Sequence, residues 1–242
     1  MRIHETAEQQ VGTRAACAGR RCVQGAAAQG LTRSPLLAVV ACMAVLALVA
    51  CAGGKEPSFY TLQSPAEATM TPAVRAASVL VIPGPVRVPD ALDKPEVVVL
   101  SGAQQVIPLP TDLWRSQFGE EVRTAVMGAV LADGRIAQAP AAGYAQGSAI
   151  PQYALHLGVD RMDLALGQYA RLDATWSLQR LPAGMSGAPV VCRASWQRPL
   201  SGNTVQDAVA AQQQLMQDWG SRIRRQLLGQ AGLAGGVSGC GS

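Results

Sequence analysis

The chain has 242 residues and a formal net charge of +4, and 49% of its residues are hydrophobic. Five basic and two acidic residues precede Cys51, so residues 51–242 carry 15 basic and 14 acidic residues. This balance, with an aromatic content of only 4%, argues against a nucleic-acid-binding protein that neutralises phosphates and stacks on bases.

The N-terminal region ends in an apolar run. Residues 36–50 are fifteen consecutive apolar residues, whereas a helix needs roughly 20 to cross a bilayer. Arginines precede the run and small residues end it, which is the order typical of a secretory signal peptide. We therefore expect residues 1–50 to be a signal peptide. Its long first part would be explained if synthesis started at Val23 or Leu31.

The end of this run, Leu48-Val49-Ala50-Cys51, resembles the lipobox of bacterial lipoproteins. In that family the thiol receives a diacylglycerol, the preceding peptide is removed and the new amino group is acylated. The resemblance implies lipid attachment at Cys51 and stable anchoring by the acyl chains. Because Ala52 rather than Asp follows, it also implies the periplasmic face of the outer membrane.

The rest of the chain divides into three parts. We expect a lipidated tether at residues 51–57, one domain at residues 58–229 and a flexible Gly-rich tail at residues 230–242. Two cysteines remain after Cys51, and they could pair in an oxidising periplasm. The loose sequence around Cys240 instead favours a buried free thiol at Cys192.

Apolar runs bounded by turn-forming residues predict the first strands. Residues 78–82 and 96–100 each form such a run and are expected to be buried strands. Residues 105–107 predict a short partner of the second strand. Residues 86–95, rich in proline and turn formers, predict an irregular loop between the two.

The first helix is predicted after Pro110. Thr111 and Asp112 are good N-cap residues, and apolar residues from Trp114 onward recur at three- and four-residue spacing. Gly134 predicts the end of the helix. Trp114 is expected to fill the core, because it can bury a large apolar area.

The middle of the chain changes to a period of two. Apolar and polar residues alternate over residues 153–160, 171–178 and 190–197, which predicts three half-exposed strands in an antiparallel meander. Cys192 falls on the apolar face of the third strand. His156 falls on the polar face of the first.

A last amphipathic helix is predicted to open at Thr204, where Asp207 three residues on completes a near capping box, and to close at Gly229. Together these elements predict an α/β fold. We expect a single domain in which a mixed or antiparallel β-sheet packs against two main α-helices.

The sequence contains little that supports catalysis. His156 is the only histidine after Cys51, and Ser186 lacks the second glycine of a nucleophile elbow. Asp160 and Asp163 could pair as acid and base, although a solvated strand end is the better interpretation. Phosphate loops and clustered metal ligands are missing. We therefore expect a binding or coupling module with no catalytic residue, metal or cofactor.

The order of segments resembles the ABC-type transport auxiliary lipoproteins of the PqiC/YmbA type. Phe59-Tyr60-Thr61-Leu62 follows the lipobox where the family typically shows Tyr-Tyr-Thr-Leu, and the pattern continues through residues 84–95, Trp114 and residues 207–212. The Phe at position 59, the long leader and the Gly-rich tail depart from the pattern.

This resemblance implies a non-catalytic accessory of an intermembrane lipid transport system that supports envelope integrity. The partner would be an MCE-domain protein that forms a tunnel through the periplasm, fed by an inner-membrane ABC transporter. Loop-borne groups near a membrane make good docking points, and ordinary loop packing is the alternative for each. The candidate docking residues are Phe59, Tyr60, Leu62, Pro85, Arg87 and Leu92.

Three questions stay open at this stage. A lipid carrier with its own apolar cavity is the main alternative function, and a large pocket between sheet and helices would favour it. A lipoprotein hydrolase would depend on His156. A homo-oligomer is compatible with the sequence.

Overall fold

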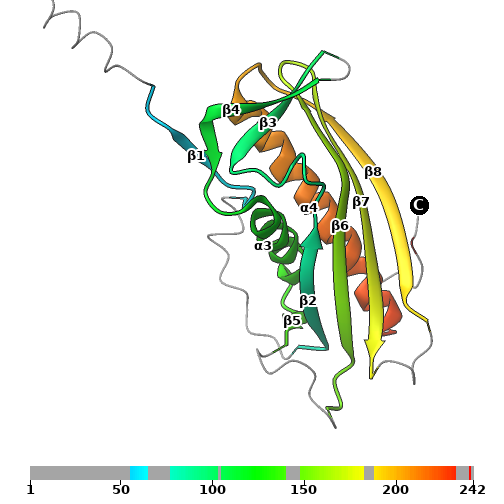
Figure 1. Cartoon of the computed structure of the whole chain (residues 1–242). Coiled ribbons are helices and arrows are strands. Elements are labelled where there is room, and N and C mark those ends of the chain that lie inside the picture. Colours follow the sequence, from blue (N-terminus) through cyan, green and yellow to red (C-terminus); the bar gives the residue numbers. More distant parts are fainter. Residues whose placement is uncertain are drawn as a thin grey trace, which may run out of the picture. The chain divides into compact units, whose positions relative to one another are not determined.

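A computed structural model describes residues 55–64, 77–102, 105–139, 148–182, 188–232 and 240. The expected signal peptide, Cys51 and most of the Gly-rich tail lie outside these residues. Eight strands and two helices form one α/β domain, as predicted (Figure 1). In chain order they are β1 (Ser58–Tyr60), β2 (Val79–Arg87), β3 (Glu96–Ser101), β4 (Gln105–Trp114), α3 (Phe118–Leu131), β5 (Ile136–Gln138), β6 (Gln152–Ala165), β7 (Tyr169–Leu181), β8 (Val190–Pro199) and α4 (Val205–Gln230).

The strands form two sheets. The larger sheet has the order β5-β2-β6-β7-β8, and the smaller has the order β1-β4-β3. β6, β7 and β8 are antiparallel neighbours, which confirms the predicted meander. β2 runs parallel to both β5 and β6. Gly167 forms the turn between β6 and β7 with a φ of 72°, a conformation that costs glycine little.

Both helices pack on one face of the larger sheet (Figure 1). Every second residue of β7 from Ala170 to Leu178 is buried there, Trp176 among them. Leu215, Trp219 and Ile223 of α4 are fully buried, as expected of the predicted amphipathic helix. The intervening residues of β7 are less buried and polar, so the opposite face of the sheet is the hydrophilic one.

The predicted start of the first helix is wrong. β4 continues through Trp114, because residues 112–114 pair with β1, and α3 begins at Phe118 after Gln117. The Asp112 carboxylate accepts a hydrogen bond of 3.0 Å from the Tyr60 hydroxyl instead of capping a helix. Trp114 is still buried and lies 5.4 Å from Phe118 between ring centroids.

Two other boundaries and one strand differ from expectation. β2 extends to Arg87, because its pairing with β6 resumes at Val86 after a shift in register, so the predicted loop starts later. The short strand β5 was not predicted. The capping box of Thr204 and Asp207 is present, but α4 passes through Gly229 and ends at Gln230.

The expectation of a free thiol at Cys192 is also wrong, because Cys192 and Cys240 form a disulfide. Cys192 does point into the core, with 2% of its surface exposed. The Arg222 guanidinium of α4 donates hydrogen bonds of 2.7 and 3.2 Å to the Cys240 carbonyl. This residue of the tail is therefore fixed to both β8 and α4.

Candidate functional site

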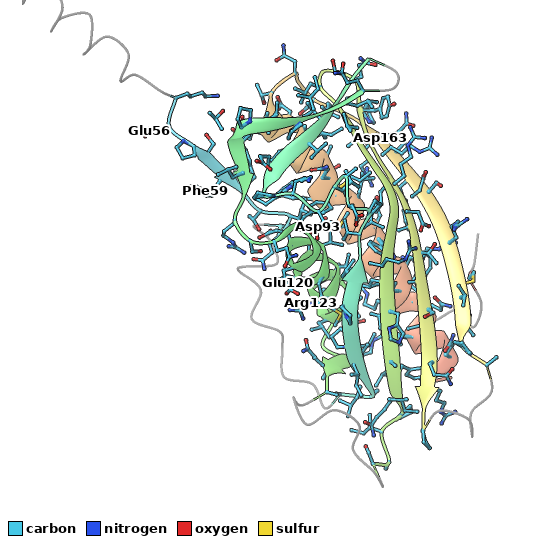
Figure 2. The ribbon with its side chains drawn as sticks, in the orientation of Figure 1. Glu56, Phe59, Asp93, Glu120, Arg123 and Asp163 are labelled. Atoms are coloured by element: carbon cyan, nitrogen blue, oxygen red, sulfur yellow. A yellow bond between two sulfur atoms is a disulfide. The ribbon has the colours of Figure 1, made fainter. Side chains whose placement is uncertain are left out.

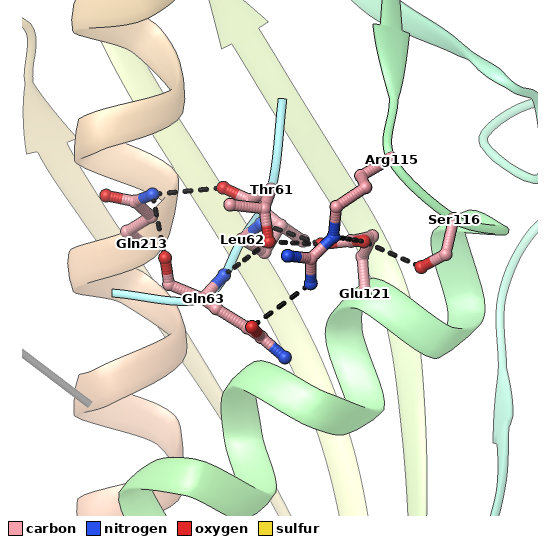
Figure 3. A network of polar contacts seen from close by, with 7 residues as sticks. All are labelled: Thr61, Leu62, Gln63, Arg115, Ser116, Glu121 and Gln213. Carbon is pink, nitrogen blue, oxygen red and sulfur yellow. Dashed lines mark hydrogen bonds and ion pairs between the residues drawn. The ribbon is translucent and has the colours of Figure 1, made fainter. Parts of the chain in front are cut away.

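The segment that follows β1 is held by a buried carboxylate (Figure 3). Glu121 of α3 has 1% of its surface exposed. It accepts hydrogen bonds from the Leu62 amide at 2.9 Å, the Thr61 hydroxyl at 2.7 Å and the Ser116 hydroxyl at 2.6 Å. A buried charge is tolerated only where hydrogen bonds replace its hydration, so this arrangement depends on all the partners being in place.

The second helix binds the same segment from the other side. The Gln213 side chain of α4 donates hydrogen bonds to the carbonyls of Thr61 at 3.0 Å and Gln63 at 3.1 Å. Arg115 donates one of 3.1 Å to the Gln63 side chain and lies 3.8 Å from Glu121. The segment that follows β1 is thus fixed to both helices within a few residues (Figure 3).

We call these contacts of Glu121, Gln213 and Arg115 with residues 61–63 the latch. The latch fixes the position of Leu62, the third candidate docking residue. Its side chain is fully buried, so it presents no surface to a partner in this structure, and we leave it out of the docking surface. The motif Tyr60-Thr61-Leu62 holds this segment to β4 and α3 through hydrogen bonds to Asp112 and Glu121. The sequence offered no signal for this, since Glu121 lies about 60 residues away and resembles any exposed glutamate of a helix.

The other two candidates in β1 differ in exposure. Phe59 projects from the strand with 65% of its surface exposed (Figure 2). Tyr60 is half-buried. Burial raises the pKa of Tyr60 above its ordinary value of 10.0, and the hydrogen bond from its hydroxyl to Asp112 raises this pKa further. Tyr60 therefore remains a neutral hydrogen-bond donor.

Two of the remaining candidates, Pro85 and Arg87, line a groove beside the start of α3. Pro85 and Arg87, both exposed, come from the end of β2, and Leu92 is half-buried in the following loop and packs against the core. The groove has a volume of about 350 Å³, and its wall includes Asp93 and Glu120, both labelled in Figure 2. The structure therefore places Phe59 and Tyr60 on the smaller sheet, Pro85 and Arg87 on the larger sheet, and Leu92 in the loop between β2 and β3.

An ion-pair network that the sequence analysis missed crosses the hydrophilic face of the larger sheet. Asp160 of β6 lies 2.7 Å from the Arg87 guanidinium and 3.2 Å from that of Arg193, and accepts a hydrogen bond from Thr175. Arg87 reaches Asp160 across Gly158, where a Cβ atom would lie only 3.0 Å from the guanidinium. The polar positions of the alternating strands were the signal that could have revealed it.

Burial of Asp160 opposes its ionisation, but hydrogen bonds from Thr175 and Arg87 outweigh this effect, so the pKa of Asp160 lies below its ordinary value of 3.8. Asp163 is likewise paired, at 2.6 Å from Arg161. Both carboxylates are thus held by arginines, which argues against an acid–base pair, but the expected solvated strand end is also wrong, because Asp163 lies within β6 and is buried.

No hydrogen-bonded catalytic group surrounds His156 in the part of the chain that the structure describes. This exposed residue lies opposite Ser177 of β7, beside a shallow pocket of about 310 Å³, and no hydrogen bond joins the two side chains among the described residues. Ser186 lies outside the described residues. Within the same residues, no three His, Cys, Asp or Glu side chains gather as metal ligands.

The space between sheet and helices bears on the lipid-carrier alternative. A cavity lined by Leu92, Trp114, Phe118, Met162 and Gln212 has a volume of about 10 Å³, which holds no more than about one water molecule. No acyl chain fits there in this conformation.

In the described part of the chain, neither helix is both long and apolar enough to span a membrane.

The sequence of residues 60–224 matches the family of ABC-type transport auxiliary lipoprotein components. The chain belongs to this family. The matched region begins in β1 and ends in α4, so it contains the latch, the groove and the arginine network of this auxiliary lipoprotein. None of the curated proteins compared with the chain matches it.

Solved structures share the fold of this family member. An uncharacterized protein matches with a TM-score of 0.56 and 16% identity, over 72% of this chain and 99% of its own. A Xanthomonas campestris protein of the DUF330 family matches with a TM-score of 0.50 and 17% identity, over 74% of this chain and 95% of its own. At these identities the similarity concerns the fold alone.

Proposed function

We propose that this auxiliary lipoprotein is anchored through lipidated Cys51 to the periplasmic face of the outer membrane, as a non-catalytic accessory of an MCE-type lipid transport system. The family match over residues 60–224 carries the proposal. The lipobox-like ending of the leader supports the anchor. An MCE-domain protein that reaches across the periplasm would meet a partner confined to the membrane surface, which raises the effective concentration of both.

The latch supports a mechanical part of this role. A partner that binds the domain pulls on its anchor, and the anchor joins the domain at β1. Because Glu121 and Gln213 fix the residues after β1 to both helices, the load would pass directly into the core of the domain.

The proposed docking surface consists of Phe59, Tyr60, Pro85, Arg87 and Leu92. Phe59 is an exposed aromatic residue, and aromatic residues are enriched in protein–protein interfaces relative to the rest of the surface. The groove beside Pro85 and Arg87 combines the apolar Val86 and Val88 with charged residues, so it offers both burial and orientation to a partner segment.

Site-specific photocrosslinking in cells tests this surface. A photoreactive amino acid at Phe59 or Pro85 is expected to form an adduct with the MCE-domain protein encoded in the same system, and one at Gln197, exposed on β8, is the matched control. All three positions are exposed, so the replacements should leave the fold intact. Adducts absent from both test positions, or equally abundant at Gln197, would count against the docking surface.

Mass spectrometry of the mature protein tests the anchor separately. The expected N-terminal peptide begins at Cys51 and carries the acyl chains, and Cys51→Ser should release the protein from the membrane fraction. An unmodified thiol at Cys51 would refute the proposed anchoring, whatever the result of the crosslinking experiment.

A further inference from the structure

The end of the β3–β4 hairpin is an exposed apolar projection. We define this hairpin end as Leu100, Val106, Ile107 and Pro108. Val106 has 49% and Ile107 37% of its surface exposed. Neighbouring residues of a strand point to opposite faces, so β4 exposes apolar side chains on both of its faces here, whereas Val99 of β3, which pairs with Ile107, is buried.

The hairpin end is also free of charge. No Asp, Glu, Lys or Arg occurs from residue 97 to 111, which includes most of both strands and their connection. Figure 1 places the hairpin end at the same end of the larger sheet as the turn between β6 and β7, where residues 166–168 are uncharged as well. A surface that faces water ordinarily carries charged residues at frequent intervals.

Exposed apolar side chains concentrate on the smaller sheet, which contains the hairpin end. Among the described residues, four large hydrophobic side chains are exposed, and Phe59, Val106 and Ile107 belong to the smaller sheet. The fourth, Val191, lies on β8. Because β1 is hydrogen-bonded to β4, the strand that receives the tether and the strand that carries the hairpin end are parts of one unit.

The tether restricts where this unit can lie. Six residues separate Cys51 from Ser58, and a chain of that length spans at most about 25 Å. Ser58 pairs with Asp112, and Ile107 precedes Asp112 by five residues, about 17 Å along the strand. An anchored domain therefore keeps the hairpin end within reach of the bilayer.

We propose that the hairpin end is a second membrane contact, in which Val106 and Ile107 enter the interfacial layer of the bilayer that holds the lipid anchor. This inference rests on the proposed anchoring at Cys51. The contact would fix the rotation of the domain on the membrane and turn the larger sheet and the groove beside Arg87 toward the periplasm. An apolar projection without charge suits the lipid interface, because no charged side chain on it must be desolvated.

Depth-dependent quenching tests the contact in the lipidated full-length mature protein. An environment-sensitive fluorescent amino acid is placed at Gln105 in one sample and at Val191 in the control. The protein is bound to vesicles of phosphatidylethanolamine and phosphatidylglycerol that contain spin-labelled lipids. We expect about a twofold loss of fluorescence at Gln105, as befits a residue at the acyl-chain boundary, and little change at Val191.

A variant with Val106→Ser and Ile107→Ser provides the second measurement. Both side chains are exposed, so we expect the thermal midpoint of the variant to match that of the unaltered protein. The acyl chains should still bind the variant to vesicles, whereas the quenching at Gln105 should disappear.

Three results would overturn the proposal, and they are distinguishable. Vesicle binding without quenching at Gln105 refutes the membrane contact and leaves the anchor intact. Failure of the purified protein to bind vesicles refutes the anchor, and the hairpin contact with it. Photocrosslinks from Ile107 to a protein rather than to lipid in cells would assign the hairpin end to partner docking.

Discussion

The backbone amide of Leu62 donates a hydrogen bond of 2.9 Å to Glu121, although the two residues are 59 positions apart. The segment that follows β1 is therefore held by a carboxylate of α3. In this fold that segment is part of the core, since Leu62 is fully buried.

Glu121→Ala is expected to lower the free energy of unfolding by about 2–3 kcal/mol, because it leaves the buried Leu62 amide without an acceptor. Glu121→Gln keeps one acceptor oxygen and should cost less. Glu120→Gln is the matched control, since Glu120 is exposed and pairs only with Arg123 among the described residues. Urea denaturation measures all three. Equal stabilities of the Ala variant and the control would show that the latch contributes nothing.

The disulfide of Cys192 and Cys240 should contribute measurably to stability. It closes a loop across a sequence separation of 48 residues, and removal of such a cross-link costs about 2–4 kcal/mol. Cys240→Ser is the suitable variant, because Cys192 is buried and a hydroxyl there would add its own cost. We expect dithiothreitol to lower the denaturation midpoint of the unaltered protein to that of the variant, and to leave the variant unchanged. A midpoint insensitive to the reductant would contradict the prediction.

The elements that the sequence predicts correctly are those with local periodicity. The meander follows from alternation along each strand, and the start of α4 follows from the reciprocal hydrogen bonds of Thr204 and Asp207. Both signals are complete within a few residues. The family resemblance likewise rests on short segments in order, and the match over residues 60–224 confirms it.

The errors have a common physical cause, which is pairing between distant segments. Asp112 is a good N-cap residue in isolation, but β1 pairs with it across more than 50 residues and draws it into a strand. Cys240 lies in a Gly-rich tail, yet Arg222 holds its carbonyl beside β8. The burial of Leu62 depends on Glu121 in the same way. No local pattern contains these partners.

Asp160→Asn should weaken the protein in a pH-dependent manner. The folded state lowers the pKa of Asp160 below 3.8, so its ionised form stabilises the fold above about pH 4 and this contribution is lost as the pH falls through the lowered pKa. The difference in unfolding free energy between the unaltered protein and the variant should therefore be largest near neutral pH and shrink below pH 4 or so. Urea denaturation at neutral and acid pH measures it. Asp90→Asn, in an exposed turn, is the control, and a difference that does not change with pH would refute the linkage.

The two helices pack closely at Gly220 of α4. A Cβ atom added there would lie 2.6 Å from both the Ala129 side chain and the Val126 carbonyl. Gly220→Ala must therefore separate α3 from α4 and is expected to cost about 1–3 kcal/mol, although alanine is the better helix former. Gly119→Ala is the matched control, because its added Cβ would meet nothing nearer than 3.7 Å, and it should change the stability by less than about 0.5 kcal/mol. Thermal and urea denaturation compare the two. If Gly220→Ala proved as stable as Gly119→Ala, the helices would have room to move apart, and the close packing would not be what fixes their spacing.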